Sequence, residues 1–237
     1  MIIAVSLRLT ACVILAVALA ACGNRATEQP VPRKVIGNAQ DKTQDPTHVE
    51  DTRPVIAAFG DSLSAGFGVE PGKSYPDDLQ RLLDAAGYHY RVVNLGVSGD
   101  TTTDGLERMP EVLASHPAIV ILEFGANDGL RGLPVASTQK NLADMVEAFR
   151  KASVEVLLAG MTLPRNYGPE YINSFEQVYV DLATKYKLAR IPFLLEGVGG
   201  HPDLTQPDGL HPTAEGAVIV ARNVMNYLQP MLQKRTH

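Results

Sequence analysis

The chain has 237 residues, of which 45% are hydrophobic and 20% charged, and its formal net charge at pH 7 is −5. This composition is ordinary for a globular protein, and a negative balance without a basic stripe argues against nucleic acid as a partner. The only two cysteines, Cys12 and Cys22, fall within the first 22 residues. The rest of the chain therefore cannot form a disulfide, a thiolate metal site or a cysteine nucleophile.

The first segment of the chain is predicted to be an export signal. An apolar run of about 13 residues follows Arg8; it is shorter than a membrane-spanning helix of roughly 20 residues but suits the core of a secretion signal. The run ends in Leu-Ala-Ala-Cys at residues 19–22, which resembles the bacterial lipoprotein signal, where cleavage leaves an N-terminal cysteine that is then lipidated. We therefore expect a signal peptide over residues 1–21 and a lipid on Cys22. The alternatives are a plain signal peptide, or an uncleaved anchor that also uses residues 1–6.

Residues 22–53 are expected to form a flexible tether. The segment 23–53 is polar and interrupted by prolines, and its five basic and five acidic residues cancel. With so few strongly apolar side chains, burial cannot offset the entropy of ordering the segment. A lipid on Cys22 would then hold the following domain close to a membrane.

Residues 54–237 are predicted to form one α/β domain. Apolar runs rich in β-branched residues predict strands at 55–59, 90–95, 118–124, 155–159 and 190–194. Apolar side chains three and four residues apart predict helices at 75–86, 104–115, 137–152, 172–186 and 213–232. Strands this apolar, alternating with helices, are typical of a parallel sheet that is covered on both faces. We therefore expect a three-layer α/β/α sandwich with a five-stranded parallel sheet.

Four polar clusters follow the expected strands. They are Gly60-Asp61-Ser62-Leu63-Ser64, residues 94–100 (NLGVSGD), Gly125-Ala126-Asn127-Asp128 and Asp208-Gly209-Leu210-His211-Pro212. Because sheets of this type bind ligands beyond the carboxyl ends of their strands, we expect the clusters to meet at one edge. That edge offers a serine, an aspartate–histidine pair, a glycine amide and an asparagine amide. A serine becomes a nucleophile when a base lies within reach, an acid orients the base and donors face the developing oxyanion.

Each of these clusters also has a purely structural interpretation. Ser62 or Asp61 can cap a helix, and the side chain of Asn127 can bond the backbone of a turn. Asp208 and His211 can be a surface pair. The chemical interpretation therefore depends on the combination of clusters and not on any one of them.

A second histidine competes for the role of base. His201 lies in the same predicted loop as His211, and Asp203 could pair with it. His211 is preferred because Asp208 lies one helical turn before it and Pro212 suits the start of a helix.

The four clusters together resemble the sequence blocks of the GDSL or SGNH hydrolases. GDSLS, the glycine in NLGVSGD, GANDGLRG and DGLHP follow the family's order with similar spacing, within residues 54–232. SGDTT and GANDGLRG bring the chain nearest to the bacterial branch of multifunctional acyl-CoA thioesterase I, lysophospholipase and arylesterase. The resemblance implies the flavodoxin-like SGNH hydrolase fold.

The resemblance also implies a role for each site residue. Ser62 would be the nucleophile, His211 the general base and then the acid, and Asp208 the group that orients the imidazole. The amides of Ser62 and Gly99 and the side chain of Asn127 would bind the oxyanion. No cofactor is expected, and no motif of metal-binding spacing occurs.

Two apolar loops, at residues 130–134 and 163–171, are expected to flank the site. In the resembling branch such loops line the acyl groove. Leu130, Leu133 and Tyr167 are therefore the candidates for contact with an alkyl chain, and ordinary loop packing is the alternative.

These inferences favour a serine ester hydrolase that acts on acyl esters or thioesters, including lysophospholipids and aryl esters. A deacetylase of envelope carbohydrate is a second interpretation, which the absence of tryptophan and only 6% aromatic residues disfavour. A non-catalytic envelope lipoprotein that binds lipid or a partner protein is a third, which a missing triad residue would have favoured. We expect a monomer that faces the periplasm of a bacterial envelope and is held at the membrane by the lipid on Cys22.

Overall fold

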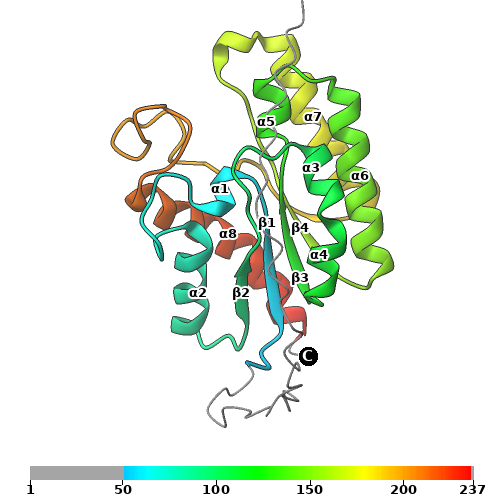
Figure 1. Ribbon diagram of the computed structural model, residues 1–237, viewed down its shortest axis with the longest axis vertical. Helices are drawn as coiled ribbons and strands as arrows, with labels where there is room; N and C mark the ends of the chain where they lie inside the picture. Colours follow the sequence, from blue (N-terminus) through cyan, green and yellow to red (C-terminus); the bar gives the residue numbers. More distant parts are fainter. Residues whose placement is uncertain (1–50, 236–237) are drawn as a thin grey trace, which may run out of the picture. The chain divides into compact units, whose positions relative to one another are not determined.

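The computed structural model describes residues 51–235, which contain a central sheet of five parallel strands (Figure 1). The strands are β1 (Val55–Gly60), β2 (Arg91–Asn94), β3 (Ile119–Glu123), β4 (Glu155–Ala159) and β5 (Ala189–Ile191). Their order across the sheet is β2-β1-β3-β4-β5, the flavodoxin-like order. The predicted signal peptide, Cys22 and all but residues 51–53 of the predicted tether lie outside the described residues.

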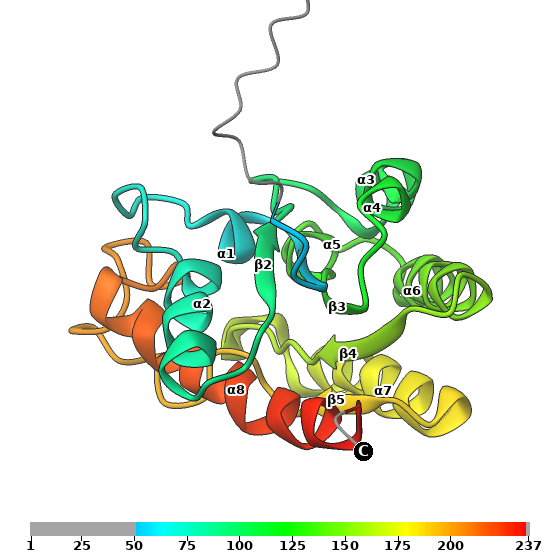
Figure 2. The ribbon, with the colours of Figure 1, turned by 90° about the horizontal axis from the view of Figure 1, so that it is seen from below.

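Helices cover both faces of this sheet. They are α1 (Ser62–Ala65), α2 (Tyr75–Ala85), α3 (Thr102–Glu107), α4 (Met109–Ala114), α5 (Ala126–Leu130), α6 (Val135–Lys151), the 3-10 helix η1 (Arg165–Tyr167), α7 (Pro169–Tyr186) and α8 (Ala214–Arg235). Figure 2 shows α2 and α8 on one face, and α3, α4, α6 and α7 on the other. The predicted three-layer α/β/α sandwich is therefore confirmed.

Burial explains why β1 and β3 occupy the centre of the sheet. Every residue of these two strands is buried, as expected for parallel strands with helices on both faces. The edge strand β2 is only partly buried. Leu79 and Leu83 of α2 and Leu228 of α8 are fully buried in the core.

Proline accounts for two differences from the predicted elements. The helix expected over 104–115 is divided into α3 and α4 at Arg108, with Pro110 in the first turn of α4, because proline lacks the amide hydrogen that would continue the first helix. Strand β5 ends at Ile191, before Pro192, for the same reason. The short helices α1, α5 and η1, with 4, 5 and 3 residues, are too short to produce a periodic pattern.

The longest helix, α8, has 22 residues and buries one side, including Val220, Val224 and Leu228. No helix within residues 51–235 combines the length and the apolar character needed to cross a membrane.

Candidate active site

Ser62 stands at the carboxyl end of β1, where the chain turns into the short helix α1. Asp61 caps this helix, and its Oδ1 accepts a hydrogen bond from the amide of Leu63 at 3.0 Å. A Cβ at Gly60 would lie 2.2 Å from Oε2 of Glu123, so only glycine fits there without a shift of its neighbours. A glycine, a capping acid and a serine thus end the buried strand and place Ser62 at the edge of the sheet.

Asp208 and His211 come from the loop between β5 and α8 and join Ser62 through two hydrogen bonds. His211 Nε2 lies 2.8 Å from Ser62 Oγ, and His211 Nδ1 lies 2.6 Å from Asp208 Oδ2. Asp208 Oδ1 also accepts hydrogen bonds from the amides of Leu210 and His211. Burial alone would raise the pKa of Asp208, but these hydrogen bonds outweigh it and lower the pKa below its ordinary value. Asp208 therefore stays ionised beside the imidazole.

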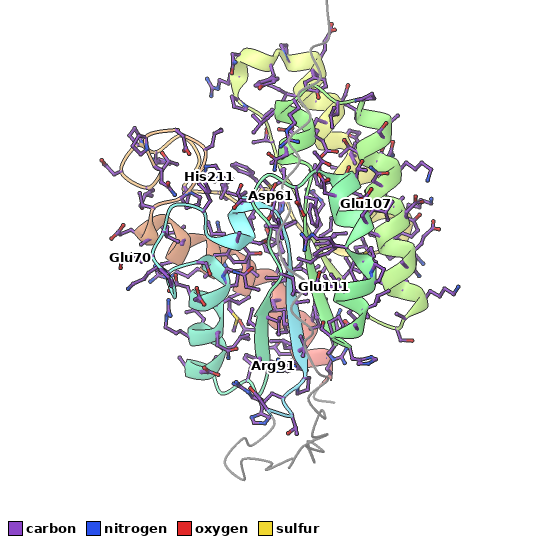
Figure 3. All side chains as sticks on the ribbon, in the orientation of Figure 1. Asp61, Glu70, Arg91, Glu107, Glu111 and His211 are labelled. Carbon is purple, nitrogen blue, oxygen red and sulfur yellow. The ribbon has the colours of Figure 1, made fainter. Side chains whose placement is uncertain are left out.

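The site lies at one end of the sheet. Figure 3 shows Asp61 and His211 near each other at the carboxyl end of β1, whereas Arg91 lies at the opposite end. This is the edge on which the four polar clusters were expected to meet.

Further contacts hold the loop between β5 and α8 that carries His211, and the sequence analysis missed them. The backbone amide of Gln206 donates a hydrogen bond to the His211 carbonyl at 2.7 Å. The Gln206 side chain donates to the carbonyls of Phe67 and Pro212 at 2.7 and 2.9 Å. The ring of Phe67, half exposed, lies against the imidazole with 4.6 Å between ring centroids. The imidazole is thus positioned by a loop contact and a ring contact in addition to Asp208.

The other candidate base lies apart from this arrangement. His201 is exposed, and within residues 51–235 its ring has no hydrogen bond or ion pair with Asp203 or any other residue. The structure therefore brings His211, and not His201, to Ser62.

The predicted oxyanion donors differ in whether they already have an acceptor. Asn127, the second residue of α5, donates one Nδ2 hydrogen to Asp61 Oδ2 at 3.1 Å and the other to the Asp100 carbonyl at 2.9 Å. Gly99 has φ +90°, a conformation that favours glycine. Within the described part of the chain, the amides of Ser62 and Gly99 have no hydrogen-bond acceptor. Both amides are therefore free to bind a ligand.

A buried carboxyl pair lies behind the serine. Glu123, at the end of β3, is fully buried, and its Oε2 accepts hydrogen bonds from the Asp61 amide at 3.1 Å and Ser64 Oγ at 2.9 Å. Its Oε1 has no partner in the described structure. Burial raises the pKa of Asp61 to about 6, and burial together with the charge of Asp61 raises the pKa of Glu123 well above its ordinary value. An acid at the end of an apolar run, as in residues 118–124, is the sequence signal that could have found this pair.

An apolar cavity of about 530 Å³ opens beside Ser62 and His211. Its lining includes Leu130, Met161, Leu163, Phe193, Leu195 and Leu210. The segment after β4 thus supplies much of the wall, and it begins at Met161, before the loop 163–171 that was expected to flank the site. The cavity suits an alkyl chain better than a polar substrate.

Only one of the three residues predicted to contact the substrate lines this cavity. Leu130 lines the cavity, whereas Leu133 and Tyr167 are not part of its lining. Tyr167 instead donates a hydrogen bond from its hydroxyl to the Leu130 carbonyl at 2.8 Å. It thus holds the residue that contacts the cavity.

Comparisons with known proteins find relatives over most of this chain. A model of the GDSL-like lipase/acylhydrolase family matches residues 58–219. The chain is 46% identical over 178 residues to "Esterase TesA" of Pseudomonas aeruginosa, covering 75% of this chain and 89% of that protein. It is 36% identical over 178 residues to "Thioesterase 1/protease 1/lysophospholipase L1" of Escherichia coli strain K12, covering 75% and 84%. A solved structure described as the crystal structure of TesA has a TM-score of 0.72 and 45% identity, covering 74% of this chain and 98% of that one.

Proposed function

The chain belongs to the GDSL-like lipase/acylhydrolase family, and on this premise we propose that it hydrolyses carboxylic esters and thioesters through an acyl-enzyme formed on Ser62. Membership of the family makes the protein an esterase-type hydrolase and confirms the resemblance drawn from its four sequence blocks. The mechanism rests on one observation, the two hydrogen bonds that join Ser62 to His211 and His211 to Asp208.

Acylation begins when His211 Nε2 takes the proton of Ser62 Oγ and the oxygen attacks the acyl carbon. The new oxygen–carbon bond gives a tetrahedral intermediate with a negative oxygen. When the intermediate collapses, the bond to the alcohol or thiol breaks, and His211 gives the proton to this leaving group. Water then repeats the sequence on the acyl-enzyme and releases the acid. Asp208 remains ionised and stabilises the imidazolium that forms in each half.

The negative oxygen is bound, in this proposal, by the amides of Ser62 and Gly99 and by Asn127. The two amides have no acceptor within the described residues, which supports this role. Both Nδ2 hydrogens of Asn127 are engaged, by Asp61 and by the Asp100 carbonyl. One of them must therefore turn toward the substrate as charge develops. The two free amides need no such change, and donors placed in advance are a large part of this kind of catalysis.

The cavity supports an acyl group of medium or long chain as the substrate. An acetyl group would fill only a small part of a space of about 530 Å³, which disfavours the deacetylase interpretation. The names of the relatives, an esterase and a thioesterase–lysophospholipase, are compatible with acyl lipids and acyl thioesters. Arg165 lines the same cavity, and in this proposal its guanidinium group would meet an anionic head group.

The proposal extends to the cellular location. We infer that the signal over residues 1–21 directs export and that a lipid on Cys22 holds a monomeric domain at the bacterial envelope, facing the periplasm. The support is the sequence of residues 9–22 and the polar composition of residues 23–53.

The first test measures hydrolysis of p-nitrophenyl esters, from acetyl to palmitoyl, by the purified full chain. We expect cleavage that is fastest for chains longer than acetyl, and Ser62→Ala to lower kcat by about a thousandfold or more. Ser174→Ala is the matched control, because this exposed serine on α7 bonds only its own helix backbone.

Activity that survives in Ser62→Ala would contradict the acyl-enzyme mechanism. A wild type that cleaves only the acetyl ester would contradict the assignment of the cavity to long acyl chains. A wild type that is inert on every ester would count against a simple ester hydrolase and favour a narrow specificity or the non-catalytic lipoprotein.

A further inference from the structure

Arg108, the residue between α3 and α4, makes four contacts with its guanidinium group. Nε donates to Asp100 Oδ2 at 2.7 Å, Nη1 to the Leu95 carbonyl at 2.9 Å and Nη2 to the Gly60 carbonyl at 3.2 Å. The group also lies over the ring of Phe59, 5.0 Å from its centroid. The side chain is 20% exposed, so the group acts largely out of water. The sequence analysis gave this arginine no role.

The groups that accept hydrogen bonds from Arg108 belong to two chain segments. These segments carry the backbone donors of the oxyanion site. Gly60 ends β1, two residues before Ser62. Leu95 and Asp100 lie on either side of Gly99, in the loop between β2 and α3. One planar group therefore spans the segment that presents the Ser62 amide and the segment that presents the Gly99 amide.

The third donor is linked to the same arginine through Asp100. The side chain of Asp100 pairs with Arg108, and its carbonyl accepts the Nδ2 hydrogen of Asn127. Asp100 is mostly buried, with 14% of its side chain exposed. A shift of Asp100 would thus move the Gly99 amide and release Asn127 together.

We propose that Arg108 is a positioning residue for the oxyanion site, which sets the distance between the Ser62 amide, the Gly99 amide and Asn127. This inference rests on the proposed function. Arg108 touches neither the substrate nor the triad, and it acts by holding the loop of residues 95–100 against the end of β1.

The geometry requires arginine and not only a positive charge. Arginine presents donors on three nitrogens in one plane, which matches one carboxylate and two carbonyls that diverge from one another. Lysine has a single ammonium nitrogen on a flexible stem, so it can keep the ion pair with Asp100 but cannot also span Leu95 and Gly60. Arg108→Lys therefore separates the effect of the charge from the effect of the bridge.

The loop has other supports, which predict that the variants fold. The Leu95 amide donates to the Ala58 carbonyl at 2.8 Å, and the Val97 amide to the Gly60 carbonyl at 3.1 Å. Arg131 holds the Gly99 carbonyl at 2.8 Å from the other side. Loss of Arg108 should loosen the loop and leave the cavity that binds the acyl chain unchanged.

The test compares the steady-state kinetics of the full chain with those of Arg108→Lys and Arg108→Gln, on the ester that the wild type cleaves best. We expect kcat to fall by about tenfold to a hundredfold in both variants while KM stays within about twofold, because donors to the oxyanion act mainly on the transition state. Arg81→Lys is the matched control, since Arg81 also bonds a carboxylate, Asp78, and a loop carbonyl, Gly72, away from the site. Its kcat should match that of the wild type.

A double-mutant cycle with Asn127→Ala distinguishes positioning from a general loss of structure. If Arg108 acts through the oxyanion donors, Arg108→Lys should cost at least about threefold less in the Asn127→Ala background than in the wild type. Equal losses in the two backgrounds, a kcat within about twofold of wild type in both Arg108 variants, or a rise in KM at constant kcat would each overturn the inference. An inactive wild type would instead refute the proposed function, so the two failures are distinguishable.

Discussion

Glu123 and Asp61 are carboxyl groups that share a buried environment behind Ser62. Their pKa values are raised above 4.5 and 3.8 respectively, chiefly by burial, and that of Asp61 reaches about 6. The native protein therefore holds these protons more tightly than the unfolded chain. The stability that these two groups contribute is fully present below their unfolded pKa values and is lost as pH rises through the native ones.

Glu123→Gln should remove the part of this dependence that Glu123 contributes. The amide is isosteric with a protonated carboxyl and can still accept hydrogen bonds from the Asp61 amide and Ser64 Oγ. We expect the free energy of unfolding of the variant, relative to wild type, to increase between pH about 5 and about 8, as measured by urea denaturation.

A carboxyl with the opposite shift provides the control for this pH series. The pKa of Asp104 is lowered, first by the hydrogen bond from the Thr101 side chain. Asp104→Asn should therefore show a loss of stability that stays constant between pH about 5 and about 8, because Asp104 is ionised in both the folded and the unfolded chain across this range. A Glu123→Gln variant whose difference from wild type does not change with pH would contradict the raised pKa.

Side chains differ in how far their roles could be predicted. The meeting of Ser62, Asp208 and His211 could be predicted because each sits in a polar cluster that follows a strand, directly or after a loop, and the parallel sheet brings such clusters to one edge. The oxyanion roles of Gly99 and Asn127 stay predictions. Arg108 and Glu123 were not found, since their partners are remote backbone groups and a neighbouring strand. A charged residue at the end of an apolar run, such as Glu123, is recognisable as unusual from the sequence. Only the tertiary structure identifies the groups that it binds.

One buried carboxylate forms hydrogen bonds that link helices α3, α5 and α6. Asp128, in α5, accepts hydrogen bonds from the amide and hydroxyl of Thr102 at the start of α3 and from the hydroxyl of Thr138 in α6. It is 2% exposed. The sequence analysis placed it only in a polar cluster after a strand, because the period of a helix does not show which neighbouring helix an acid will bond.

Asp128→Ala should destabilise the fold by about 3 kcal/mol, because it leaves one amide and two hydroxyls buried without their acceptor. Urea denaturation at neutral pH measures this loss. Asp144→Ala, which breaks the exposed pair with Lys140 on α6, should cost about 0.5 kcal/mol or less. Equal losses for the two variants would show that Asp128 does not connect these helices.

The sheet separates the site from the point where the chain enters the described domain. The site is at the carboxyl edge, next to Ser62, whereas β1 begins at Val55 on the amino edge, the end of the sheet at which Figure 3 shows Arg91. The sheet topology was predictable because long apolar strands that alternate with helices admit few arrangements. Within the described domain, Val55 and Ser62 thus lie at opposite ends of β1.

This separation predicts that location and catalysis respond independently to the proposed lipid anchor. Cys22→Ala in the full chain should move the protein from the detergent phase to the aqueous phase in Triton X-114 partitioning, because a lipid on Cys22 is proposed to supply its membrane affinity. The kcat on p-nitrophenyl esters should stay within about twofold of wild type, because Ser62, His211 and Asp208 are joined to one another within residues 51–235. Cys12→Ala, which changes the only other cysteine, is the matched control and should keep the detergent-phase behaviour. If Cys22→Ala also remains in the detergent phase, an uncleaved N-terminal anchor replaces the lipid as the attachment.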